Sequence, residues 1–171
     1  MPVVPIAIAY MSLGFKDYSV KHKLVPFCGL NVVLALYLSM VHQAAPNAVM
    51  QYLSTQKNIQ GIIFLTACHG TPYYSHLHQD VPMKFLECPP KFYSNDSAEP
   101  VDQSEAFFED PAKAVSALEL EKFNYVVFYE SLLPQIQDQL GDQGFQLCKT
   151  FWHTHFPESK TSSHMFVYCL E

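Results

Sequence analysis

The sequence predicts a small α/β domain with a mixed, partly parallel sheet, preceded by one or two transmembrane helices. From residue 43 onward, short runs rich in Ile, Val, Phe and Tyr alternate with segments whose apolar residues recur at helical spacing. Before that point, Leu24 to Val41 is an eighteen-residue run without a charge. As a helix this run is about 27 Å long, close to the thickness of a bilayer core.

Two uncharged stretches are candidate membrane segments. We predict that residues 24–42 form a transmembrane helix; the alternative is a buried helix of a soluble protein. Residues 1–15 are also uncharged but contain Pro2 and Pro5, and they are about five residues too short to cross a bilayer. They are therefore predicted to be a truncated membrane segment.

The charges between these stretches predict an orientation. Residues 16–23 contain three lysines, and the next basic residue after the second stretch is Lys57. The positive-inside rule then makes 16–23 a cytoplasmic loop and places residues 43–171 on the opposite, lumenal side. Asn95 lies in an Asn-Asp-Ser sequon within that region, so it is a candidate for N-glycosylation.

The composition excludes several classes of function. The 171 residues carry 10 Lys and Arg against 16 Asp and Glu, and the basic residues do not form a patch suited to nucleic acid. The five cysteines form no C-x-x-C pair, so a zinc ribbon or a thioredoxin motif is excluded. Neither a Gly-rich phosphate loop nor the motifs of common hydrolases and metal enzymes occur. We therefore expect no cofactor, no bound metal and no catalytic residue in this chain.

Hydrophobic periodicity places the helices of the α/β domain. Apolar residues at helical spacing predict helices over Pro46–Lys57 and Ala112–Lys122. A third helix is predicted over Ser131–Leu140, with Gly141 as its C-terminal stop. Residues Tyr93–Asp110 are expected to form a long acidic loop.

Five short runs bounded by turn residues predict the strands. They are Gly61–Thr66, Met83–Leu86, Tyr125–Tyr129, Phe145–Trp152 and Met165–Leu170. Since a helix separates the third run from the fourth, we expect a right-handed parallel crossover between them. The last two runs should form a hairpin at the edge of the sheet.

The densest group of polar and aromatic residues follows the first predicted strand. Thr71-Pro72 favours an extended or turn conformation, which should present the following tyrosines at the loop surface. Tyr and His combine stacking faces with hydrogen-bonding groups, as sites for sugars or phosphates require. The candidate substrate-binding residues are His69, Thr71, Tyr73, Tyr74, His76 and His78.

Two alternative roles for this segment remain open. It can be a rigid connection, filled by aromatic side chains, that docks the domain onto its membrane part. It can also be a zinc site of a hydrolase that uses His69, His76 and His78, although their spacing matches no strong zinc pattern.

His153 and His155 are secondary candidates, because alternation along a strand places both on one face. They would approach the first group if their strands are neighbours; otherwise they are partly exposed residues of an edge strand. The four cysteines after residue 43 allow three disulfide pairings, of which Cys148–Cys169 across the predicted hairpin is geometrically the easiest. Independent buried thiols are an equal alternative.

Several motifs together resemble a known family. They are the stretches Ala67–His78 (ACHGTPYYSHLH), Pro82–Pro90 (PMKFLECPP), Phe151–Glu158 (FWHTHFPE) and Ser163–Tyr168 (SHMFVY), with His42-Gln43 at the end of the membrane segment. They resemble the C-terminal part of the GPI mannosyltransferase III family. This family is one of the multi-spanning, dolichol-phosphate-mannose-dependent glycosyltransferases of GT-C type, related to the ALG-type mannosyltransferases of the endoplasmic reticulum.

The resemblance implies an α1,2-mannosyltransferase that adds the third mannose to the GPI precursor. The implied partners are dolichol-phosphate-mannose, the GPI glycolipid precursor and the endoplasmic reticulum membrane, with the C-terminal domain in the lumen. Enzymes of this family carry their essential acidic residue in the first lumenal loop, to which no position of this sequence corresponds. Met1–Ile6 matches only the end of a membrane motif that opens with an HKEFRF-like sequence.

We therefore expect a C-terminal portion that is not catalytic by itself. The alternative is a non-enzymatic, membrane-anchored lumenal module that binds glycolipid or regulates the full enzyme.

Overall fold

The computed structural model describes residues 20–88 and 102–170 and divides the chain into two compact units. The first unit is Met1–Val41 and the second is His42–Glu171. The predicted membrane segment 1–15 and the glycosylation candidate Asn95 lie outside the described residues.

The described part of the first unit is helix α2, Val20–Met40. It begins within the predicted loop 16–23, so the end of that loop is helical. From Phe27 onward its large apolar side chains are exposed. The one amide side chain among them, that of Asn31, donates to the carbonyl oxygen of Phe27 at 2.8 Å and so satisfies its donor within the helix.

Among the described residues, no single helix meets the length and hydropathy expected of a membrane span. Pro26–Met40 and Ala45–Ser54 meet them only when the two helices are counted together.

The second unit contains a five-stranded sheet, and each strand lies within one residue of its predicted bounds. The strands are β1 (Ile62–Leu65), β2 (Met83–Phe85), β3 (Tyr125–Tyr129), β4 (Gln146–Trp152) and β5 (His164–Cys169). The predicted partly parallel sheet is confirmed, since β1 pairs in parallel with both β2 and β3. The predicted hairpin is also confirmed: β4 pairs antiparallel with β5 and lies at the edge.

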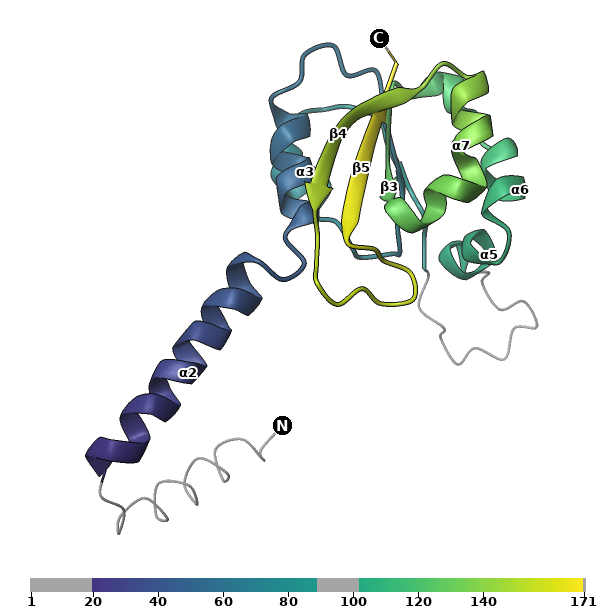
Figure 1. The fold of residues 1–171 in the computed structure, drawn as a ribbon. Coiled ribbons are helices and arrows are strands. Elements are labelled where there is room, and N and C mark those ends of the chain that lie inside the picture. The colour runs from purple at the N-terminus through teal and green to yellow at the C-terminus, as the bar shows by residue number, and fades with distance from the viewer. Residues whose placement is uncertain (1–19, 89–101, 171) are drawn as a thin grey trace, which may run out of the picture. The chain divides into compact units, whose positions relative to one another are not determined.

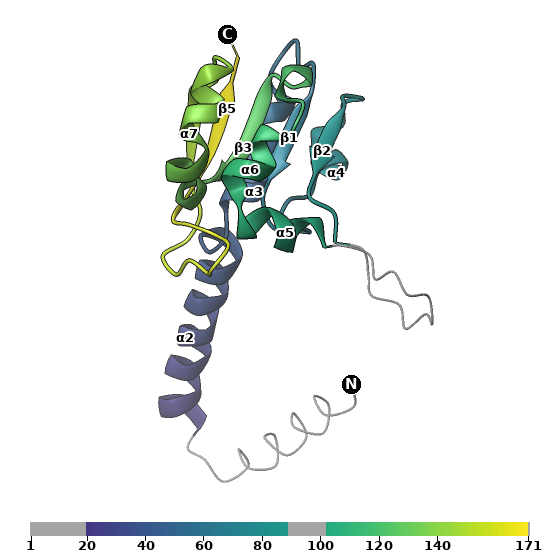
Figure 2. The same cartoon turned by 90° about the vertical axis from the view of Figure 1, so that its right-hand side faces the viewer.

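The strand order is β2-β1-β3-β5-β4; Figure 1 labels β3, β5 and β4, and Figure 2 labels β2, β1, β3 and β5. Strand β5 is antiparallel to both β3 and β4, so these two run in the same direction, as a parallel crossover requires. They are not neighbours, however, because β5 lies between them. The chain thus leaves β3, passes over β5 to the edge, and returns as β5 to fill the gap.

The helices of the second unit have the following bounds. They are α3 (Ala45–Ser54), α4 (Tyr74–Leu77), α5 (Gln103–Glu109), α6 (Pro111–Ser116) and α7 (Leu133–Asp142), with 3-10 turns at Leu120–Lys122 and Glu130–Leu132.

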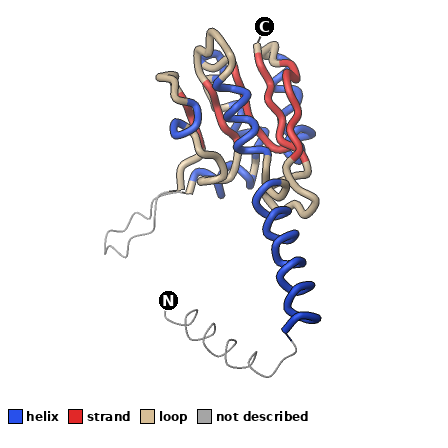
Figure 3. Tube along the Cα trace, turned by 90° about the vertical axis from the view of Figure 1, so that its left-hand side faces the viewer, coloured by secondary structure: helices blue, strands red, loops and turns tan. Residues whose placement is uncertain are grey.

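These helices cover both faces of the sheet, because the side chains of the central strands alternate between two cores. Ile63 and Leu65 of β1 contact the helices on one face, among them α5, α6 and α7, which lie toward the viewer in Figure 2. Ile62 and Phe64 point to the opposite face, which α3 covers in Figure 3. Strand β3 is buried on all five residues, as expected of a central strand with both faces covered.

Each of the three predicted helices has a counterpart (α3, α6 and α7) with different bounds, since α3 for example ends at Ser54 rather than Lys57, whereas α4 and α5 were not predicted. Three corrections concern α6, α7 and α5. The helix predicted over Ala112–Lys122 is shorter, because α6 ends at Ser116 and only a 3-10 turn follows. The predicted stop at Gly141 is wrong: α7 runs on to Asp142, and the left-handed residue is Gly144, with φ of 83°. The expected loop up to Asp110 contains α5.

Two disulfides cross-link this unit. Cys68–Cys88, with Cα atoms 6.0 Å apart, ties the segment after β1 to the segment after β2. Cys148–Cys169, with Cα atoms 5.9 Å apart, crosses the β4–β5 hairpin, as the easiest of the predicted pairings does. The alternative of independent thiols is wrong for these four cysteines. Disulfides are typical of proteins folded in an oxidising compartment.

Candidate functional site

The order of the strands creates a gap at one end of the sheet. After β1 the chain moves outward to β2, whereas β3 lies on the other side of β1. The segments that leave the carboxyl ends of β1 and β3 therefore diverge. In open α/β sheets, ligands bind in the crevice outside the carboxyl ends of the strands at such a switch point.

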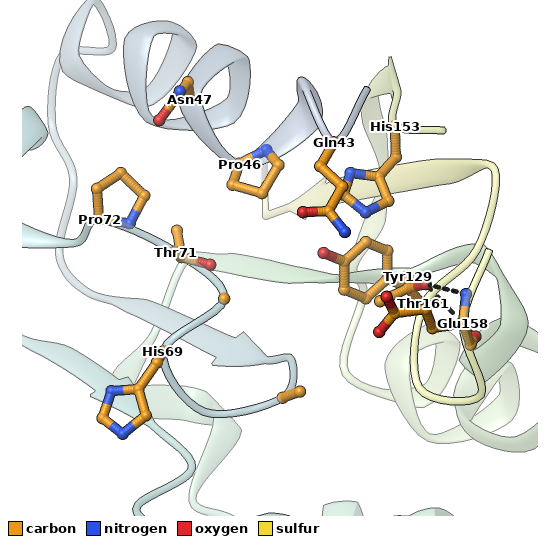
Figure 4. A pocket seen from close by; sticks show the side chains of 12 residues that line it. Gln43, Pro46, Asn47, His69, Thr71, Pro72, Tyr129, His153, Glu158 and Thr161 are labelled. Atoms are coloured by element: carbon orange, nitrogen blue, oxygen red, sulfur yellow. Dashed lines mark hydrogen bonds between the residues drawn. The ribbon is translucent and has the colours of Figure 1, made fainter. Parts of the chain in front are cut away.

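A pocket of about 460 Å³ lies at this switch point. One wall is the segment after β1, from Ala67 to Pro72, and Tyr129 at the end of β3 forms the base. The remaining walls come from the segment before and within α3 and from the connection between β4 and β5. Figure 4 shows the hydroxyl of Thr71 directed toward the Tyr129 side, with His153 and Gln43 opposite. The lining residues are Gln43, Pro46, Asn47, Ala67, His69, Gly70, Thr71, Pro72, Tyr129, His153, Glu158 and Thr161.

Two polar side chains of the pocket are buried without a partner. Thr71 is 6% exposed and His153 is 2% exposed, and neither Thr71 Oγ1 nor His153 Nδ1 has a hydrogen-bond partner. A buried polar atom left unpaired costs about 1–3 kcal/mol, so native proteins rarely keep one without a reason. Both residues line the pocket, and the hydroxyl of Tyr73 lies close to that of Thr71.

The electrostatic character of the pocket is close to neutral. Burial lowers the pKa of His153, and the nearby His42 lowers it further, while Glu158 opposes the shift. Burial raises the pKa of Tyr129 to about 12. Around pH 7 the imidazole and the phenol are therefore both uncharged. The side chain of Glu158 is the one carboxylate of the lining, and the lining contains no Lys or Arg.

The backbone around the pocket is locally strained. Five described residues other than glycine have positive φ, and His69 (61°), Tyr73 (41°) and His78 (52°) all belong to the segment after β1. Gln43, on the other side of the pocket, has φ of 57°. Such conformations cost about 1–3 kcal/mol each and tend to occur where a ligand is held. The Cys68–Cys88 disulfide holds the start of the segment after β1.

The structure divides the predicted binding residues into two groups. His69 and Thr71 line the pocket together with His153, which was only a secondary candidate by sequence. His153 follows β4 and is buried, so the alternative of an exposed edge-strand residue is wrong for it. His155 is exposed, and its ring contacts Trp152 at 4.6 Å between centroids, away from the lining.

Tyr73 does not lie at the loop surface as predicted. Its ring stacks on Phe85 at 4.5 Å and meets the edge of Phe64 at 5.1 Å, within the core under α3 and α4. Burial raises the pKa of the Tyr73 hydroxyl, and the nearby hydroxyls of Thr66 and Thr71 partly oppose this shift. The hydroxyls of Tyr73, Thr66 and Thr71 make no hydrogen bond of ordinary geometry. Tyr73 thus acts as an aromatic plug, as expected of a rigid connection filled by aromatic side chains.

The remaining predicted residues lie on or beside α4. Tyr74, His76 and His78 are exposed and do not line the pocket. The hydroxyl of Tyr74 donates to the carbonyl oxygen of Val81 at 3.1 Å. Within residues 20–88 and 102–170, no three His, Cys, Asp or Glu side chains gather as metal ligands, so the zinc site of His69, His76 and His78 gains no support.

Several pocket residues were not predicted from the sequence. The sequence pattern places Tyr129 only in a strand and gives no site role to Gln43, Asn47, Glu158 and Thr161. The backbone N–H of Glu158 donates to Thr161 Oγ1 at 2.8 Å, which shapes the turn that brings both to the pocket. One signal was present for Tyr129, because it is the last residue of a buried strand and such positions border the crevice.

Comparison with known proteins adds an independent observation. Residues 1–78 match the Alg9-like mannosyltransferase family. Over 98% of its length the chain is 30% identical to GPI alpha-1,2-mannosyltransferase 3 of Bos taurus and 31% identical to that of Xenopus laevis. Over 74% of its length it is 36% identical to GPI mannosyltransferase 3 of Yarrowia lipolytica. No solved structure matches the chain.

The predicted family resemblance is confirmed. The similarity to the GPI alpha-1,2-mannosyltransferases includes the segments that form the pocket, because the bovine and Xenopus alignments cover nearly the whole chain. The chain spans about a third of the length of these relatives.

Proposed function

We propose that this chain supplies the C-terminal portion of a GPI α1,2-mannosyltransferase. The observation that carries the proposal is its similarity, over 98% of its residues, to proteins named for this activity. In this reaction a hydroxyl of the GPI precursor attacks the anomeric carbon of dolichol-phosphate-mannose. The bond to phosphate breaks, dolichyl phosphate leaves, and a carboxylate accepts the hydroxyl proton.

We assign no catalytic residue to the chain itself. Glu158 is the one carboxylate of the pocket, and it is exposed at the lining rather than buried in a site that excludes water. The role that suits the α/β domain is to bind substrate, with the carboxylate supplied by the part of the enzyme that these residues do not cover.

The proposal includes a location in the endoplasmic reticulum. Residues 24–42 would span the membrane, 16–23 would face the cytoplasm, and the domain after residue 43 would lie in the lumen. Two disulfides within that domain support an oxidising compartment. The exposed apolar side chains of α2 support a lipid environment for that helix.

A chimera tests the activity. In mammalian cells that lack GPI alpha-1,2-mannosyltransferase 3, the bovine protein would be expressed with its matching segment replaced by this chain. We expect GPI-anchored proteins to return to the cell surface, with the intact bovine protein as the positive control and the bovine protein without that segment as the negative control. A chimera that accumulates in the membrane but restores no staining would contradict the proposal.

The chain expressed alone separates the remaining alternatives. We expect no staining from it, because the catalytic carboxylate is assigned elsewhere. Restored staining would mean that the 171 residues contain the catalytic group. If neither the chimera nor the chain restores staining but the chain alters the activity of the intact enzyme, the non-enzymatic regulatory module is the better description.

A further inference from the structure

The pocket at the switch point between β1 and β3 has two buried polar atoms in its walls, Thr71 Oγ1 and His153 Nδ1, that make no hydrogen bond of ordinary geometry, although the hydroxyl of Tyr73 lies near that of Thr71. Thr71 and His153 face the cavity from opposite sides (Figure 4), and both are more than nine-tenths buried. Thr71 Oγ1 can donate and accept a hydrogen bond, and His153 Nδ1 can do one or the other depending on its tautomer. Asn47 and Gln43 add amide groups to the lining.

The charge of the lining selects among ligands. A phosphate or nucleotide site needs Lys, Arg or a run of backbone N–H groups at a helix N-terminus to neutralise its ligand. The lining has no Lys or Arg, and its one charged side chain, that of Glu158, is negative. A phosphate would therefore meet repulsion, whereas a neutral ligand with several hydroxyls would find acceptors and donors.

The shape of the pocket fits the same class of ligand. Its volume of about 460 Å³ lies within the range of about 300–1,000 Å³ typical of small-molecule sites. The rings of Tyr129 and His153, with centroids 5.0 Å apart, provide an aromatic surface for the apolar face of a sugar. The pocket can hold a mono- or disaccharide.

We propose that this pocket binds a neutral hexose unit of a glycan, with Thr71, His153 and Glu158 bonding its hydroxyls and Tyr129 beneath its ring. The neutral-sugar class follows from the lining alone, while the assignment of the hexose as mannose of the acceptor glycan rests on the proposed function. The proposed sugar site is therefore the switch-point pocket and does not include the exposed residues of α4.

Binding can be measured on the full chain in detergent micelles, apart from any transfer reaction. The probes are mannobiose and, for the opposite class, inorganic phosphate, each followed by saturation-transfer NMR and by amide shifts in the labelled chain. We expect saturable mannobiose binding with shifts at Gly70, Thr71 and Glu158, and no such shifts with phosphate. Absence of mannobiose binding at about 50 mM sugar, or shifts with phosphate instead, would overturn the proposal.

Matched variants locate the site. Thr71→Val removes the buried hydroxyl with little change in shape and should weaken mannobiose binding about tenfold. Thr150→Val makes the same chemical change on the exposed edge strand and should leave binding unchanged. Equal binding by both variants would overturn the proposal.

Two further results keep the inference separate from folding and from the proposed function. If Thr71→Val does not fold, the amide shifts that mannobiose causes in the unmodified chain test the proposal instead. Shifts at the pocket support it, and shifts on α4 contradict it. The transfer activity is measured independently in the chimera. Mannobiose binding in a chain whose chimera is inactive would refute only the proposed function, and an active chimera with no sugar binding would refute only the pocket.

Discussion

The two disulfides offer a controlled test of how this domain is stabilised. Cys68–Cys88 has a sequence separation of 20 and Cys148–Cys169 one of 21. The loss of chain entropy on closing loops of these lengths corresponds to about 3 kcal/mol each, and the two values differ by less than about 0.1 kcal/mol. Replacing either pair by serines should therefore lower the free energy of unfolding by nearly the same amount.

The single tryptophan makes this measurable. Trp152 lies at the end of β4, so its fluorescence during urea unfolding reports on the sheet. We expect each double serine variant to lose about 3 kcal/mol, with a somewhat steeper dependence on urea concentration because the unfolded chain is less compact without the bond. A loss below about 1 kcal/mol in either variant, or losses that differ by more than about 1 kcal/mol, would refute the reasoning from loop entropy.

The same pair of variants should differ in function. Cys68–Cys88 fixes the segment that carries Thr71, whereas Cys148–Cys169 joins β4 to β5 near the opposite end of the sheet. Under conditions in which both variants remain folded, we expect weaker mannobiose binding only when the first disulfide is removed. Equal binding by the two variants would mean that the segment after β1 holds its conformation without the disulfide.

Three further predictions concern single residues. Burial lowers the pKa of His153, so as the pH falls the unfolded chain binds a proton near pH 6.5, before the folded chain does. The free energy of unfolding should therefore fall as the pH drops below about 6.5. In urea titrations at about pH 7.5 and about pH 5.5, His153→Gln should show a smaller difference in the free energy of unfolding between the two pH values than the unmodified chain does. The same difference in both proteins would contradict this prediction. Ile136→Ala, at a fully buried site of α7, should cost about 2–5 kcal/mol in the same assay, while the exposed Gln137→Ala should cost less than about 0.5 kcal/mol. Gly61→Ala should destabilise by about 1–3 kcal/mol, because the added Cβ would lie 2.9 Å from the carbonyl oxygen of Lys122; a neutral effect would show that the backbone there can yield.

The strands were predictable because their signal is local. Tyr125–Tyr129 is a run of β-branched and aromatic residues between turn residues, and it matches β3 residue for residue. Helix ends were less predictable, since the end of α7 depends on where the chain can turn toward β4. Gly144 provides that turn with its positive φ, and Gly141 remains within the helix.

The site was only partly predictable, because its composition depends on packing between distant segments. Thr71 and His69 were recognised from the density of polar residues after β1. Tyr73 belongs to the same dense segment, yet its ring is more stable against Phe64 and Phe85 than at the surface. Nothing in the local pattern distinguishes a tyrosine that binds a ligand from one that fills a core.

The position of β5 gives the pocket the wall that the β4–β5 connection forms. Because β5 is inserted beside β3, the connection from β4 to β5 passes the carboxyl end of β3, and this brings His153, Glu158 and Thr161 opposite Thr71. If β4 had paired directly with β3, the connection would cross the same two strand positions in the opposite direction, so His153 would follow the strand next to β3 and Thr161 would approach the outer strand. The binding site therefore depends on a long-range choice of strand order, and substitutions that weaken the β3–β5 pairing should impair sugar binding before they unfold the domain.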